Sequence, residues 1–141
     1  TEGNADIVIV SAGGAPFDQS LYQSLWALQN ASKAAKRNGT IVLLAQCVNG
    51  LGAEAFTQLA RVDDIRELKR RYMIGAETLA VLKKTQKTNR VTLVSALPGY
   101  LVDSLGLDNA RTANEAYQRA IQSRRGRKTI VIPYGSQSIL V

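Results

Sequence analysis

Four short apolar runs, widely separated along the chain, limit the fold more than any other feature. They cover residues 7–10, 40–46, 91–95 and 129–132. Each run is mostly apolar and lacks a regular alternation of polar and apolar residues, which is typical of strands buried on both faces of a parallel sheet. The segments between them are long enough to hold crossover helices. We therefore expect a three-layer α/β fold, with a mainly parallel sheet of about four strands flanked by helices in a Rossmann-like arrangement.

Helical periodicity fills most of the intervening segments. The first expected helix starts at a Ser20/Gln23 capping box, with Asp18 as a competing N-cap. It continues through Lys36 and Arg37 in its last turn to a stop at Asn38-Gly39. Two or three helices are expected within residues 53–87. Another helix is expected to follow a Thr112/Glu115 capping box. Residues 96–111 are predicted to be loop, and residues 138–141 a short edge segment.

Length and composition favour one domain. The 141 residues suffice for a single core, and Cys47, the only cysteine, has no partner for an intrachain disulfide. Without a histidine to activate its thiol, Cys47 is interpreted as a small packed residue. No apolar run approaches the roughly 20 residues that span a bilayer, and no signal peptide is visible. We expect a cytoplasmic protein with no membrane partner.

The net charge of +7 is compatible with anionic ligands or nucleic acid. The basic residues are dispersed, apart from runs at 69–71 and 124–128. The first run follows acidic residues along one expected helix, as the helix dipole favours, and the second lies at an expected helix end. Both runs are explained as solvated surface, so no nucleic-acid partner is expected.

A glycine-rich loop joins the first strand to the first helix. Gly13 and Gly14 permit backbone angles that other residues resist, Pro16 fixes its own φ, and Asp18 follows just before the cap. Strand–loop–helix units of this kind commonly hold ligand sites at the carboxyl ends of the strands in open α/β sheets. The loop is therefore predicted to shape a site.

Two aromatic residues and an amide follow this loop. Tyr22 and Trp26 lie four residues apart, so they share one face of the expected helix, and Gln23 is adjacent near its start. A binding role competes with plain packing of the two rings and plain capping by Gln23.

Residues 13–23 resemble the Gly-Gly-x-Pro-x-Asp-x-x-x-Tyr-Gln segment of the nickel-dependent lactate racemase family, in its C-terminal domain. The similarity continues through residues 45–52, Phe56, residues 131–135 and residues 138–140. The resemblance implies that residues 1–141 form the C-terminal domain of a larger two-domain protein. The chain begins only a few residues before its first apolar run, which we interpret in the same way.

The resemblance also implies what lies outside this chain. In the family, a nickel pincer nucleotide and the histidines that exchange the substrate's proton belong to the N-terminal domain. The chain has no histidine. We therefore expect no catalytic residue, metal ligand or cofactor in this chain alone, and no activity without the missing N-terminal domain.

By the same resemblance, Tyr22 and Gln23 face a small 2-hydroxy acid, and this domain closes the active site and orients the substrate. The family has a lysine where this chain has Trp26. That change either reshapes the pocket for a larger or less polar substrate or marks lost activity. The alternative is a non-catalytic module that binds an anion at the N-terminus of the first helix, a nucleotide or a nucleic acid.

Overall fold

The computed structural model describes residues 3–52, 66, 76–123 and 128–137. The expected helices between residues 53 and 75, the basic run at 69–71, most of the run at 124–128 and the edge segment at 138–141 lie outside these ranges.

Five parallel strands form one sheet in the order β4-β3-β2-β1-β5. The strands are β1 (Ala5–Ser11), β2 (Ala35–Leu44), β3 (Arg90–Val94), β4 (Asp108–Ala110) and β5 (Thr129–Ile132). Successive strands from β1 to β4 step toward one edge, and the chain then returns to place β5 on the other side of β1. The predicted α/β class with a parallel sheet is confirmed.

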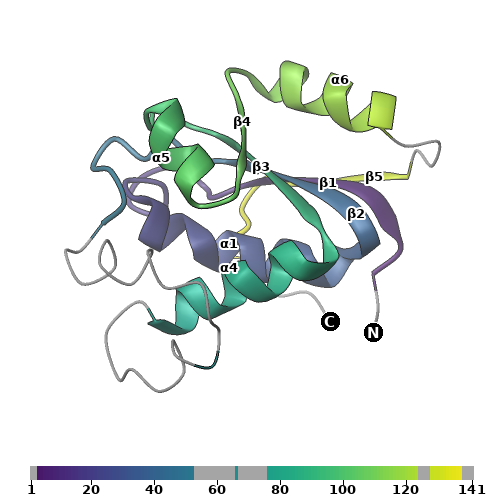
Figure 1. The fold of residues 1–141 in the computed structure, drawn as a ribbon, viewed down its shortest axis with the longest axis horizontal. Helices are drawn as coiled ribbons and strands as arrows, with labels where there is room; N and C mark the ends of the chain where they lie inside the picture. The colour runs from purple at the N-terminus through teal and green to yellow at the C-terminus, as the bar shows by residue number, and fades with distance from the viewer. Residues whose placement is uncertain (1–2, 53–65, 67–75, 124–127, 138–141) are drawn as a thin grey trace.

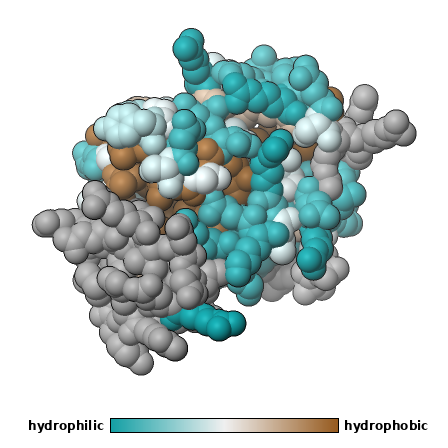
Figure 2. Space-filling view, in the orientation of Figure 1, coloured by the Kyte–Doolittle hydropathy of each residue, from teal (hydrophilic) through white to brown (hydrophobic). Residues whose placement is uncertain are grey.

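Helices cover both faces of the sheet (Figure 1). Helices α1 (Leu21–Ala34) and α4 (Ala76–Thr88) pack together on one face, and α6 (Ala113–Ser123) lies on the other. A short helix, α5 (Gly99–Ser104), follows β3 near β4. On the face shown in Figure 2, hydrophilic side chains cover α6, while hydrophobic surface gathers near α5.

The main core lies between the sheet and the α1–α4 pair. Its largest fully buried side chains are aliphatic and come from both layers: Ile7, Leu21, Leu25, Leu28, Ile41, Leu43, Leu79, Leu82 and Leu93. A smaller cluster under α6 holds Val42, Ala110 and Ala116. Ile9, paired with Val131, packs at the margin of this second cluster, and Val131 is 63% exposed. The sheet therefore has one thoroughly covered face and one that α6 covers only in part.

The first helix ends earlier than predicted. It stops at Ala34, and Ala35 pairs with Ala5 as the first residue of β2. Lys36, expected in the last helical turn, instead places its ammonium nitrogen 2.5 Å from a carboxylate oxygen of Asp6. The chain then turns through Asn38, whose φ is +66°. Strand pairing and this ion pair outweigh the helix propensity of Ala35 and Lys36.

Two elements within the expected loop at 96–111 were missed. Helix α5 is only six residues long, and Pro98-Gly99, a turn signal by sequence, instead opens it. Strand β4 is the tripeptide Asp108-Asn109-Ala110, whose residue types are depleted in strands. Neither segment is long enough to display a period, so the sequence predicted four strands where the described residues form five.

Substitution of Asn38 tests the left-handed backbone conformation at residue 38. With φ at +66°, Asn38→Gly is expected to be close to neutral, and Asn38→Ala to cost about 1 kcal/mol more than the glycine variant. If the helix continued to residue 38, the order would reverse, because alanine is about 1 kcal/mol better than glycine inside a helix. Equilibrium urea unfolding of both variants measures the sign.

Candidate functional site

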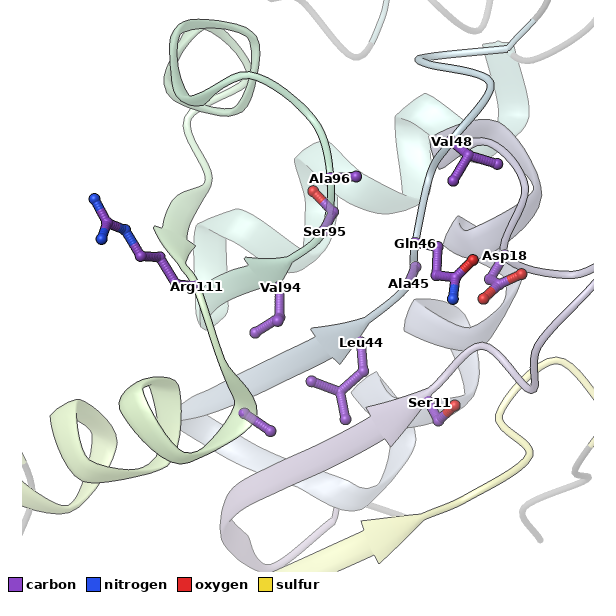
Figure 3. Close-up of a pocket in the computed structure, with 11 residues that line it drawn as sticks. Ser11, Asp18, Leu44, Ala45, Gln46, Val48, Val94, Ser95, Ala96 and Arg111 are labelled. Atoms are coloured by element: carbon purple, nitrogen blue, oxygen red, sulfur yellow. The ribbon is translucent and has the colours of Figure 1, made fainter.

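The carboxyl ends of the strands border an open pocket of about 660 Å³ (Figure 3). Its lining comes from the ends of β1, β2 and β3, the loops after them and the start of α6: Ser11, Asp18, Leu44, Ala45, Gln46, Val48, Val94, Ser95, Ala96, Arg111 and Ala113. The volume lies in the range of small-molecule sites. The position is where open α/β sheets bind their ligands.

The pocket combines an apolar wall with oriented hydroxyl groups. Leu44 and Val94 supply apolar surface from neighbouring strands. The Ser11 hydroxyl oxygen accepts a hydrogen bond from the Gly13 N–H at 3.1 Å, and that of Ser95 accepts from the Leu97 N–H at 3.2 Å. Each serine therefore keeps its hydroxyl proton for donation. Arg111 lies on β4's side of the pocket, with its guanidinium directed away from Leu44 (Figure 3).

Asp18 joins the predicted glycine-rich loop to this pocket. Its side chain lies beside that of Gln46 in the pocket lining (Figure 3). Its N–H donates to the Gly14 carbonyl at 3.2 Å, and its own carbonyl accepts from the Cys47 N–H at 2.7 Å. Asp18 is thus held by its backbone on both sides. It does not cap α1, since Ser20 holds that position.

The loop after β2 runs along the loop after β1 through backbone hydrogen bonds. Beyond the Cys47–Asp18 bond, the Asn49 N–H donates to Gln19, and the N–H groups of Leu21 and Tyr22 donate to the carbonyls of Gly50 and Leu51. The Gln23 N–H donates to the Ser20 hydroxyl at 3.3 Å. All three first-turn N–H groups of α1 are therefore used within the protein, which leaves none for the anion of the alternative interpretation.

The predicted substrate-facing residues lie in the first two turns of α1, beside the pocket and not in its lining. The capping box is confirmed: the Ser20 hydroxyl donates to the Gln23 side-chain carbonyl at 3.1 Å. Gln23 thus keeps its amide hydrogens for other partners. Tyr22 is partly buried against the core, and Trp26 is 48% exposed. The two rings therefore do not simply share a buried face.

The glycine-rich loop uses the backbone freedom that the sequence predicted. Gly13 and Gly14 have φ values of +102° and +77°, and the Ala15–Pro16 peptide bond is cis. The sequence missed Ser11, Gln46, Ser95 and Arg111 as pocket residues. Their common signal is position, since each lies at the end of a strand or within two residues after it, but strand order decides which of these ends meet.

The described residues include no cluster of three or more histidine, cysteine, aspartate or glutamate side chains that would hold a metal. The whole chain has no histidine. Its one thiol, Cys47, is 2% exposed and lies 3.9 Å from the Ser24 hydroxyl. The described residues therefore offer no set of side chains that fits the nickel implied by the family resemblance. Within the same ranges, no helix is long and apolar enough to cross a membrane.

Burial should keep Cys47 unreactive. Desolvation raises the pKa of its thiol from 9.0 to about 11, so the nucleophilic thiolate is scarce at neutral pH. We expect alkylation of the native protein to be slow near pH 7 and to accelerate up to about pH 11. In urea-unfolded protein, the rate of alkylation should instead rise around the ordinary thiol pKa of 9.0. Fast alkylation of native protein at pH 7, absent in Cys47→Ser, would contradict the packed interpretation.

Gly52 sets the contact between the second loop and α1. A Cβ at this position would lie 2.8 Å from the Tyr22 Cβ and 3.3 Å from the Ser20 hydroxyl oxygen. We expect Gly52→Ala to lower the free energy of unfolding by about 1–3 kcal/mol more than Gly13→Ala does. Gly13 is the matched control, because its φ is also strongly positive while its nearest neighbours would be 3.8 Å away. Equal losses in urea unfolding would refute a steric role for Tyr22.

Comparison with known proteins agrees with the fold and the motifs. The family model of the lactate racemase C-terminal domain matches residues 1–141. The lactate racemase of Lactiplantibacillus plantarum is 31% identical over 144 residues, covering 94% of this chain and 34% of that protein. That of Thermoanaerobacterium thermosaccharolyticum is 46% identical over 52 residues, covering 37% of this chain and 12% of that protein.

A solved structure of the lactate racemase apoprotein from Thermoanaerobacterium thermosaccharolyticum superposes on the chain with a TM-score of 0.89 and 26% identity. It covers 99% of this chain and 36% of the solved chain. The chain therefore spans about a third of the length of these relatives. Because the family model covers every residue, the chain belongs to the lactate racemase C-terminal domain family.

Proposed function

We propose that this chain is the substrate-cleft domain of a two-domain enzyme that inverts the stereocentre of a small 2-hydroxy acid. The proposal rests on the arrangement of loops and helix at the carboxyl ends of the strands. There, backbone bonds between two loops fix the first turns of α1 beside an open pocket. Membership of the lactate racemase C-terminal domain family supports the reaction class. The remaining length of the relatives leaves room for an N-terminal domain across the cleft.

The nickel cofactor of the resemblance belongs, in this proposal, to that N-terminal domain. The described residues hold no cluster that fits a nickel site, so the work proposed for this chain is binding and orientation. A domain with a free, buried cysteine suits the cytoplasm, where thiols stay reduced. That location is part of the proposal.

Tyr22 and Gln23 are proposed to hold the substrate by hydrogen bonds. A phenol and an amide can bond to a hydroxyl or carboxylate without changing charge near neutral pH. The capping bond from Ser20 occupies the side-chain carbonyl of Gln23 and so restricts the direction in which its amide hydrogens donate. Closure of the domain over the substrate would exclude water from the reacting carbon.

Trp26 is proposed to select the substrate. It stands half-exposed one turn after Tyr22, at the position of the family's lysine. An indole offers apolar surface and one N–H donor in place of a cation that would attract a carboxylate. A 2-hydroxy acid with an apolar substituent larger than methyl therefore suits this cleft better than lactate.

Restoring a lysine tests this assignment in the full-length, cofactor-loaded protein. Trp26→Lys is expected to raise the ratio of kcat/KM for lactate to that for 2-hydroxyisocaproate by roughly tenfold, because a carboxylate-facing cation is regained and apolar surface is lost. Racemisation of both acids is followed by chiral chromatography. Gln29→Lys, one turn further along the exposed side of α1, is the matched control for added charge. An equal change in this kcat/KM ratio in both variants would refute a specificity role for Trp26. If the wild-type protein racemised neither acid, the result would favour a domain that has lost its chemistry.

A further inference from the structure

The pocket at the carboxyl ends of the strands is separate from the residues proposed to hold the substrate. None of the described residues that line it belongs to α1, the helix that carries Tyr22 and Gln23. The pocket opens on the α6 side, next to Leu44 and Ala113, whereas α1 covers the opposite face of the sheet (Figure 1). A small acid held by the first turns of α1 therefore leaves this pocket to another group.

Asp18 is the one carboxylate among the described residues that line the pocket, and it is only 9% exposed. No hydrogen bond or ion pair joins its side chain to another described residue. A carboxylate removed from most of its water loses solvation, and buried polar groups in folded proteins are normally paired. Its backbone bonds to Gly14 and Cys47 nevertheless hold it in this place. The pocket wall thus carries a negative charge for which the described part of the chain supplies no cation.

Exposed hydrophobic side chains gather around the same edge. Val48, Tyr100 and Tyr134 are among the exposed large hydrophobic residues, and they follow the carboxyl ends of β2, β3 and β5. Val48 lines the pocket, Tyr100 lies on α5 where Figure 2 shows hydrophobic surface, and the Tyr134 ring would lie 3.8 Å from a Cβ at Gly13. Exposed apolar and aromatic side chains grouped in this way are typical of surfaces that bind another protein or domain.

We infer that this edge is the docking surface for the N-terminal domain of the same polypeptide, and that an arginine of that domain enters the pocket and pairs with Asp18. The chain spans about a third of the length of its relatives, so most of such a protein lies outside it. A domain that closes over Tyr22 and Gln23 would also cover the pocket beside them. The inference rests on the two-domain arrangement in the proposed function, and not on the reaction.

A guanidinium fits the pocket better than an ammonium group. It carries five N–H donors in one plane and can pair with both oxygens of the Asp18 carboxylate. Gln46 offers a side-chain carbonyl, and Ser11 offers the second lone pair of a hydroxyl oxygen that already accepts one backbone N–H. Leu44 and Val94 supply an apolar wall for the aliphatic stem. Docking would therefore give the buried carboxylate a partner and cover the exposed hydrophobic rim.

Small-angle X-ray scattering of the full-length protein, with and without lactate or 2-hydroxyisocaproate, measures the ratio of closed to open molecules. Asp18→Asn is expected to lower this ratio roughly tenfold or more, because a charge-assisted pair is lost. Asp103→Asn is the control for the change in charge and should not alter the ratio. Asp103 is exposed and lines a different pocket, with Arg90 and Asp108 at the starts of β3 and β4. Urea unfolding of each variant shows whether it remains folded.

The hydrophobic rim has a matched pair of variants in the same measurement. Val48→Ser is expected to lower the ratio of closed to open molecules about fivefold, because less apolar surface would be buried on docking. Val131→Ser is the control, since Val131 is equally exposed at 63% but lies within β5 and outside the pocket lining. Equal effects of the two substitutions would overturn the assignment of this edge as the docking surface.

A charge swap tests the pairing itself. Asp18→Arg should favour the open form more than Asp18→Asn does, because two cations would then meet. Arginines of the N-terminal domain are replaced by aspartate one at a time in the Asp18→Arg background, and one of these replacements should restore closure. Rescue only by replacement of a lysine would overturn the choice of arginine, and rescue at no position would overturn the ion pair.

Failure of the inference and failure of the proposed function give different results. Unchanged closure in Asp18→Asn, in a protein that racemises a 2-hydroxy acid, would overturn the inference and leave the proposed function intact. Closure that depends on Asp18, in a protein that racemises neither acid, would support the inference and overturn the proposed reaction. Wild-type protein with no closed molecules under any of these conditions would overturn docking at this edge.

Discussion

The backbone bonds between the loops after β1 and β2 are the constraint on which the rest of the site depends. They link Asp18 with Cys47 and Gln19 with Asn49, and they continue into the first turn of α1. The helix start is thereby satisfied from inside the protein, at no cost in unpaired N–H groups. The same bonds place the pocket wall and the Tyr22–Gln23 edge on one rigid unit. Side chains at this edge can therefore act on a ligand without the backbone having to rearrange first.

Parallel pairing of β1 and β2 makes that contact possible. Neighbouring parallel strands end at the same edge, so the segments that follow them start side by side. Strands β3 and β4 extend the edge and bring Ser95 and Arg111 to the pocket. Among the described residues, the face under α1 and α4 carries most of the core, while the face under α6 carries a smaller cluster. The pocket opens on the α6 side, where Leu44, Val94 and Ala113 are its neighbours.

Sequence reasoning found the features that depend on local chemistry. Continuous apolar runs located four strands, and the Ser20/Gln23 pattern located the start of α1. It failed where distant partners decide the outcome. Ala35 and Lys36 favour a helix by themselves, yet their partners are Ala5 and Asp6, some thirty residues earlier. The pocket lining was predicted only in part, because the strand order that unites Ser11, Gln46 and Ser95 is not encoded in the spacing of any one motif.

The N–H groups at the start of α1 are all hydrogen-bonded within the protein, and this affects how the sequence of such a domain can diverge. The start of α1 is held mostly by main-chain hydrogen bonds, which residues of almost any type can make. Gly52 is an exception, because a side chain there would collide with Tyr22. Trp26 takes no part in that framework and projects into solvent. The residue at this position can therefore change under selection for new substrates while the backbone framework beneath it stays the same.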